Sequence, residues 1–170
     1  MSLARSTLLA VVCVCLGCAS LALAQAPTPV GKPIRLGLIF PLTGGSSDMG
    51  NSARVGAQIA INEINSAGGY LSRPMELVIR DDKADPDTGL KAAEDLVLKE
   101  KVIATVGFCN SGVAMKALDV FQKNQNILFV TCATGSAITG KYPAPQSFIF
   151  RNSARDALQT QFLIDDIVKR

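Results

Sequence analysis

Apolar residues gather along this chain in short dense runs that predict β-strands. The run Ile34–Phe40 is almost continuously apolar, which is typical of a strand covered on both faces of a parallel sheet. Further runs predict four more strands, each bounded by polar or glycine-containing segments. Together the predicted strands cover residues 34–40, 75–80, 102–108, 127–131 and 148–151.

Between these runs the apolar residues recur every three or four positions, which is the period of a helix. Polar residues at the expected starts are candidate N-caps: Asp87 or Thr88, then Ser111, then Ser153. Leu158, Phe162 and Ile167 share one face of the last helix, and 133–145 is expected to be a loop. The predicted helices cover about 50–65 and 89–101, a segment that starts at Ser111, and a segment that starts at Ser153.

Strands and helices thus alternate from residue 34 to the end of the chain. Such alternation predicts an α/β fold, with a parallel, doubly wound sheet, right-handed crossovers and helices on both faces. The chain stops inside charged helix, at 165–170, without a cap or tail. We therefore expect it to be the first part of a longer protein.

The first 24 residues have the three parts of a secretory signal. Arg5 is the positive charge, 8–16 is uncharged and apolar, and Ala22-Leu23-Ala24 places small residues before a cut that leaves Gln25 first. A transmembrane anchor and a lipoprotein modified at Cys18 are the alternatives, and both fit less well. We expect a periplasmic protein with a cleaved signal and no stable membrane insertion.

Composition and charge exclude several classes of function. The chain is 170 residues long with a formal net charge of +3, and no basic run suggests a nucleic-acid partner. It has no histidine, which removes imidazole-based nucleophile activation and histidine-bound zinc or haem. An exported enzyme stays open as an alternative, with Cys109 or Cys132 as nucleophile, although neither has a base.

Five cysteines are present, and three lie in the signal. Cys109 and Cys132 remain in the mature chain, where an oxidising compartment permits a disulfide between them. Two free, buried thiols are the alternative that we favour slightly. Asp81, Asp82, Asp85 and Asp87 lack the spacing of a calcium loop, so we expect a solvated acidic loop and a helix cap.

Three loops follow predicted strands at the edge where open parallel sheets bind ligands. The loop 41–50 has no nucleotide-binding motif, and 132–136 offers small polar groups. Ser111, at the start of a helix, places a hydroxyl beside free N–H groups, an arrangement that suits a carboxylate. By local chemistry alone, an ordinary loop, a plain N-cap and a polar turn are the simpler interpretations.

An ordered set of short segments resembles the type I periplasmic-binding proteins. The set begins with Gly-Leu-Ile-Phe-Pro-Leu-Thr-Gly at 37–44 and continues through Ala60-Ile61-Asn62-Glu63-Ile64-Asn65 to Gly68-Gly69. Asp81-Asp82, Asp85-Pro86, Val106-Gly107 with Ser111, and 127–139 also fit. The similarity covers about residues 34–170 and is greatest to the leucine/isoleucine/valine-binding proteins of ABC importers.

This resemblance implies a fold of two α/β lobes that clamp a ligand between them. It assigns 34–147 to the first lobe and 148–170 to the crossing segment and the first helix of the second lobe, the remainder being absent. Residues 25–33 contain prolines and no periodic pattern, so we expect a short tether there. The resemblance further implies a solute-binding protein, not an enzyme, that uses hinge closure and no cofactor. The partners would be an amino acid, branched-chain or a similar small carboxylate, and the permease subunits of an ABC transporter.

The resemblance also implies roles for single residues. Ser111 and Thr134 would hold the ligand carboxylate, and the Cys132 carbonyl would accept from its ammonium group. Other pocket positions are Cys109, Asn110 and Met49, and Met49 replaces an aromatic residue common in the family. The family's disulfide positions correspond to Ala84 and Asn110, so that bridge cannot form. A ligand-sensing receptor module of the same superfamily is the alternative function.

Overall fold

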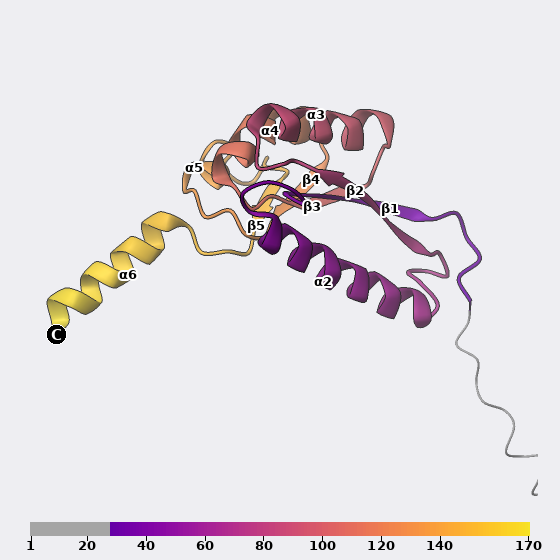
Figure 1. The fold of residues 1–170 in the computed structure, drawn as a ribbon, viewed down its shortest axis with the longest axis horizontal. Helices are drawn as coiled ribbons and strands as arrows, with labels where there is room; N and C mark the ends of the chain where they lie inside the picture. The colour runs from indigo at the N-terminus through magenta and orange to yellow at the C-terminus, as the bar shows by residue number, and fades with distance from the viewer. Residues whose placement is uncertain (1–27) are drawn as a thin grey trace, which may run out of the picture.

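A five-stranded parallel sheet organises residues 28–170, the part of the chain that the computed structural model describes (Figure 1). The spatial order of the strands is β2-β1-β3-β4-β5, and every neighbouring pair is parallel. This confirms the predicted sheet and strand count. The strands are β1 (Ile34–Phe40), β2 (Met75–Asp81), β3 (Ala104–Gly107), β4 (Ile127–Val130) and β5 (Ile149–Arg151).

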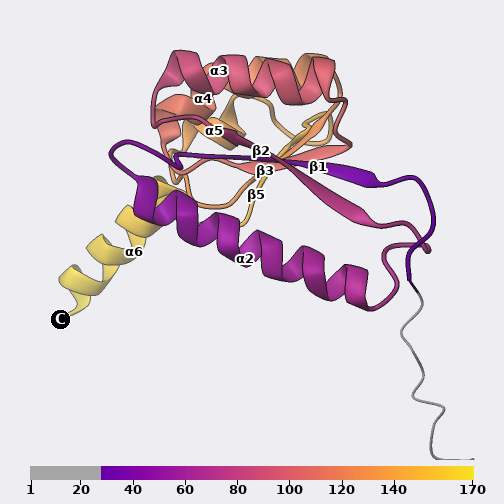
Figure 2. The same cartoon turned by 45° about the vertical axis from the view of Figure 1, so that its right-hand side comes forward.

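Helices lie on both sides of this sheet. Figure 2 shows α3 and α4 on one side and α2 on the other, while α6 projects away from the sheet. None of the helices among residues 28–170 is long and apolar enough to cross a membrane. The helices are α2 (Ser47–Ser66), α3 (Pro86–Glu94) with a π-helical end (Asp95–Lys99), α4 (Ser111–Lys123), α5 (Ala137–Gly140) and α6 (Asp156–Lys169).

The main core lies between the sheet and the α3–α4 pair. Phe121 of α4 and Phe108, which follows β3, are fully buried. Their rings pack edge to face, with the ring centroids 6.4 Å apart. Leu118 and Leu128 are also fully buried in this cluster. The helix period predicted for α4 therefore places its apolar face against the sheet, as expected.

The other side of the sheet is only partly covered. In β4 the burial alternates, so that Leu128 and Val130 are buried while Ile127 and Phe129 are 43% and 39% exposed. Phe150 of β5 is 46% exposed. Contacts of α2 with the sheet are made to β1 and β2. Helices on both faces are thus confirmed, but one side leaves β4 and β5 open among the described residues.

Several predicted local features were wrong. The cap of α3 is Asp85, whose carboxylate accepts from the Thr88 N–H at 2.7 Å, rather than Asp87 or Thr88. The expected loop 133–145 contains the short helix α5. Ser153 does not cap α6, because its hydroxyl donates to the Ala133 carbonyl at 3.1 Å.

The last helix also differs from expectation in its packing. Leu158, Phe162 and Ile167 are 55%, 73% and 72% exposed. No residue of α6 is buried against residues 28–170, so the apolar face predicted for this helix has no partner here. The first 24 residues, and with them the signal and its cleavage site, lie outside the described residues.

Candidate functional site

The three candidate loops meet at the carboxyl edge of the sheet. Asn110, the residue before α4, donates from Nδ2 to the Ser46 hydroxyl at 3.3 Å, which joins the second loop to the first. The Gly135 N–H donates to the Ser111 hydroxyl at 3.0 Å, which joins the second loop to the third. The three loops that the sequence placed at one edge of the sheet are therefore neighbours in the structure.

Ser111 is the first residue of α4 rather than its cap. The cap position belongs to Asn110, and no side chain caps the helix. The Ser111 oxygen accepts from Gly135, so its own proton remains free to donate. A Cβ at Gly135 would lie 2.9 Å from the Ser111 Cβ, so this close approach requires glycine. The free N–H groups of the first turn of α4 lie beside this hydroxyl.

Thr134 precedes Gly135 in the third loop and is partly exposed. Among residues 28–170, the Thr134 hydroxyl has no hydrogen-bond partner within the protein, while its carbonyl accepts from Arg151 at 2.9 Å. The Gly135 carbonyl accepts from the same guanidinium nitrogen, also at 2.9 Å. Arg151, in β5, therefore holds the loop that presents Thr134.

The sequence reasoning missed Arg151 and Ser46. The available signal for Arg151 was an arginine at the end of a predicted strand, after a loop of small residues, because one guanidinium can donate to several loop carbonyls at once. Ser46 had no such signal. Its contact depends on Asn110, which lies 64 positions further along the chain.

Cys109 and Cys132 lie side by side, although neither forms a disulfide. Both thiols are partly exposed, and Cys132 is near enough to affect the pKa of the Cys109 thiol. Burial, together with the neighbouring Cys132 and Asp82, raises the pKa of the Cys109 thiol to about 12. Two free thiols, the favoured expectation, are therefore what the structure shows. They are half-buried rather than fully buried.

The acidic segment after β2 braces the first loop. Asp81 accepts from the Leu42 N–H at 2.8 Å and from the Thr43 hydroxyl at 2.6 Å. Burial alone would raise the pKa of Asp81, but hydrogen bonds from Thr43, Lys83 and Leu42 outweigh it and lower that pKa. Asp82 is fully buried rather than solvated, and burial raises its pKa.

Met49 lies in the first turn of α2 and is 55% exposed. It is thus at the same edge of the sheet as the three loops. A side chain in this position is available to a ligand that enters over the first loop. No contact in the structure brings it to Ser111 or Thr134, so its predicted role stays a prediction.

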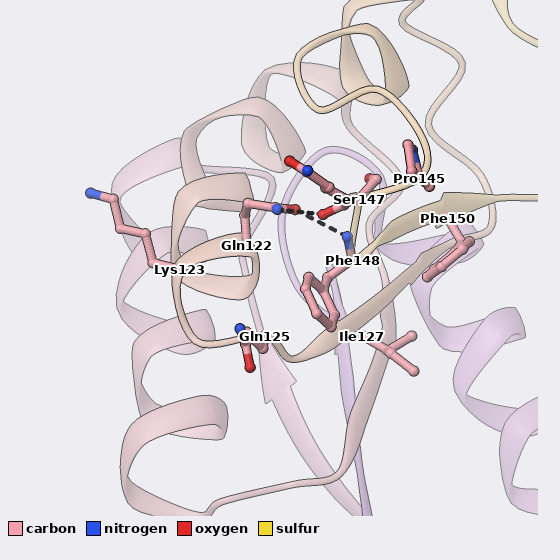
Figure 3. A pocket seen from close by; sticks show the side chains of 9 residues that line it. Gln122, Lys123, Gln125, Ile127, Pro145, Ser147, Phe148 and Phe150 are labelled. Atoms are coloured by element: carbon pink, nitrogen blue, oxygen red, sulfur yellow. Dashed lines mark hydrogen bonds between the residues drawn. The ribbon is translucent and has the colours of Figure 1, made fainter.

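A cavity of about 590 Å³ lies elsewhere, at the amino ends of β4 and β5 (Figure 3). Gln122 spans one wall, donating to the Gln146 carbonyl at 2.8 Å and accepting from the Phe148 N–H at 3.0 Å. These bonds attach the chain before β5 to α4. Because parallel sheets bind ligands at their carboxyl ends, we do not assign the site to this cavity.

Comparison with known proteins identifies the family. The family described as "Periplasmic binding protein" matches residues 33–164. The chain belongs to this family. A Leu/Ile/Val-binding protein homolog 3 from Brucella melitensis is 32% identical over 136 residues, which cover 80% of this chain and 36% of the relative.

Solved structures of this periplasmic-binding-protein family show the same fold. LivJ from Streptococcus pneumoniae, in complex with isoleucine, is 30% identical with a TM-score of 0.68 and covers 73% of this chain. A solute-binding protein from Rhodopseudomonas palustris, in complex with 3,4-dihydroxybenzoic acid, is 26% identical with a TM-score of 0.64 and covers 72% of it. The matches span 34% and 32% of those chains.

This periplasmic-binding chain therefore spans about a third of the length of the relatives it matches. The type I architecture expected from the resemblance is confirmed for the part present, a parallel sheet flanked by helices. The two named complexes contain ligands of different shape that share a carboxylate.

The Cys109 thiol should react slowly with alkylating reagents. The thiolate is the reactive form, and a pKa of about 12 leaves on the order of one thiol in 10⁴ ionised at pH 8. We expect Cys109 in the folded chain to be alkylated by iodoacetamide at least about 100-fold more slowly than in urea. Peptide mass spectrometry over time measures both rates.

The variant Cys132→Ala is the matched control for this effect. It removes one stated cause of the raised pKa, so Cys109 should be alkylated faster than in the native chain, and the rate should rise at lower pH. Equal rates in the folded and urea-unfolded chains would contradict the raised pKa.

Proposed function

We propose that this chain is the first-lobe portion of an extracytoplasmic solute-binding protein that captures a small carboxylate, such as a branched-chain amino acid, for an ABC importer. The single observation that carries the proposal is the hydrogen bond that joins the loops of Ser111 and Thr134, from the Gly135 N–H to the Ser111 hydroxyl at 3.0 Å. The family match supports the class of protein.

The chemistry of this edge suits a carboxylate. The Ser111 hydroxyl, the Thr134 hydroxyl and the N–H groups that begin α4 are all donors. Donors without a protein partner are costly unless water or a ligand satisfies them. Hydrogen bonds to a charged group contribute about 1.5–3 kcal/mol each, so a few of them account for micromolar binding of about −8 kcal/mol.

The same edge has an acceptor for an ammonium group. The Cys132 carbonyl is free of hydrogen bonds among residues 28–170, and it lies two residues before Thr134. An α-amino acid places its ammonium next to its carboxylate, so one ligand can reach both groups. The names of the relatives, which include leucine, isoleucine and valine, support an apolar side chain.

The domain boundaries fit this proposal. Strand β5 (Ile149–Arg151) ends the sheet, and α6 leaves it without burying a residue. We infer that 34–147 is the first lobe and that 148–170 crosses to a second lobe, which would close over the ligand by a hinge movement. Export to the periplasm, with permease subunits as partners, completes the proposed role.

Removing the Ser111 hydroxyl should weaken binding. In the full-length protein that carries this sequence, Ser111→Ala should raise the dissociation constant for leucine about 10- to 100-fold, since one charged hydrogen bond is lost. Isothermal titration calorimetry with leucine, isoleucine and valine measures this. Thr134→Val should have an effect of the same direction.

Two controls separate the site from the fold. Ser66→Ala, at the exposed end of α2, should leave the affinity unchanged. Leucinamide, which lacks the carboxylate, should bind the native protein at least about tenfold more weakly than leucine. Equal binding of leucine and leucinamide, or an unchanged affinity in Ser111→Ala, would refute the proposed carboxylate site.

A further inference from the structure

The pairing of β3 with β4 continues past the ends of both strands. The last register pair within the strands is Gly107 with Val130. Beyond it, the Thr131 N–H donates to the Gly107 carbonyl at 3.2 Å, and the Ala133 N–H donates to the Phe108 carbonyl at 3.1 Å. These two bonds differ by one residue in register, and they hold together the segments that contain the cysteines: Cys109 follows Phe108, and Cys132 lies between Thr131 and Ala133.

Residues on neighbouring hydrogen-bonded segments have the spacing that a disulfide needs. Neighbouring strands lie about 4.7–4.9 Å apart, and disulfides join residues whose Cα atoms are about 4.4–6.8 Å apart. The influence of Cys132 on the pKa of the Cys109 thiol agrees with this placement.

Both thiols can be reached from solvent. Cys109 and Cys132 are partly exposed at the edge of the sheet, and neither is among the buried residues of the core. The Cys132 sulfur has one further polar neighbour, the Thr131 hydroxyl at 3.7 Å. An oxidant that enters the candidate cleft therefore meets the two thiols together.

We propose that Cys109 and Cys132 form a redox-active dithiol that closes into an intramolecular disulfide across the candidate ligand cleft. The bridge would join the loops that carry Ser111 and Thr134 and enclose the whole of α4 and β4 between its ends. This modification goes beyond the proposed function, and it does not depend on the identity of the ligand.

The chemistry is a thiol–disulfide exchange with a small exogenous disulfide as oxidant. One cysteine, after losing its proton to solvent, attacks the oxidant, forms a mixed disulfide and releases one thiolate. The second cysteine, also deprotonated, attacks the protein sulfur of that mixed disulfide and releases the second thiolate. Two protein thiols lose two electrons, and one oxidant disulfide becomes two thiols.

The second step should be much faster than the first. The two thiols lie on neighbouring hydrogen-bonded segments, so their effective concentration far exceeds that of a millimolar reagent. Because burial raises the pKa of the Cys109 thiol, thiolate is scarce at neutral pH, and the first step is best followed at pH 9.

The test treats the folded full chain with oxidised glutathione at pH 9, then blocks free thiols and digests with trypsin. Trypsin releases Cys109 in peptide 102–116 and Cys132 in peptide 124–141. We expect a disulfide-linked pair of these peptides to exceed their glutathione-modified forms about tenfold or more. Dithiothreitol should return both peptides to the free-thiol form.

The single variants Cys109→Ala and Cys132→Ala are matched controls. Each keeps one thiol without its neighbour, so each should accumulate a stable mixed disulfide with glutathione. The proposal is overturned if the native chain carries glutathione on both cysteines. It is also overturned if both thiols stay free after the exposure that modifies the single variants, or if the single variants do not react.

Discussion

Replacing Phe121 with alanine should lower the free energy of unfolding by about 3–5 kcal/mol. Phe121 is fully buried between α4 and the sheet, and its ring packs edge to face on Phe108. The substitution loses the transfer free energy of the ring and leaves a cavity that rigid neighbours cannot fill. Urea denaturation followed by circular dichroism measures the difference.

Phe162→Ala is the matched control for this prediction. Phe162 lies in α6 and is 73% exposed, so in the 170-residue chain its removal should change stability by no more than about 0.5 kcal/mol. If Phe121→Ala is too unstable to fold, Phe121→Leu should still fold and show a smaller loss, because most of the cavity is filled. Equal losses for Phe121 and Phe162 would contradict the packing described for the two helices.

Gly50→Ala should lower the free energy of unfolding by about 2–3 kcal/mol. A Cβ at this position would lie 2.0 Å from the Pro41 carbonyl oxygen and 2.7 Å from its carbon, both of which are backbone atoms. The start of α2 would have to move away from the end of β1. The helix begins at Ser47 rather than near Gly50 as expected, so Gly50 lies in the first turn of α2, and the first candidate loop before it would move as well.

A second glycine in α2 provides a control that should raise stability instead of lowering it. Gly56, also in α2, has no atom within 4 Å of the position that a Cβ would take. Alanine is the better helix former, so Gly56→Ala should raise stability by about 0.5–1 kcal/mol. Thermal unfolding of the two variants and of the native chain shows whether each substitution raises or lowers stability. If both variants lose stability, the expected gain from helix propensity at Gly56 is wrong. If Gly50→Ala loses none, the close approach to Pro41 is wrong.

The fold was predictable because its signals are local. The apolar run Ile34–Phe40 and the three-four spacing of α4 each come from neighbouring residues in the sequence. Alternation of the two kinds of element then limits the sheet to a parallel one. The predicted cap of α3 is two or three residues too late, because Asp85, Asp87 and Thr88 all have side chains that can cap.

The site was predictable only in its loops. Ser111 was expected to cap its own helix, but its hydroxyl accepts instead from Gly135, 24 residues further along the chain. The contacts of Arg151 with the third loop are likewise set by the neighbouring positions of β4 and β5. Such partners follow from tertiary packing, which periodicity does not encode. The exposure of α6 also could not be predicted, because an apolar face in sequence does not say which surface covers it.

Helix α6 is attached by hydrogen bonds to the third loop, 132–136, so this loop can affect the direction of the helix as well as ligand binding. The Asp156 N–H donates to the Thr134 carbonyl at 2.9 Å, and the Ala157 N–H donates to the Ser136 hydroxyl at 3.0 Å. The direction of α6 is therefore set by the same few residues that present the Thr134 hydroxyl. By thermodynamic linkage, a molecule that favours one shape of this loop favours one direction of α6 by an equal free energy. Any contact that holds α6 in that direction would strengthen binding at Thr134 by the same factor.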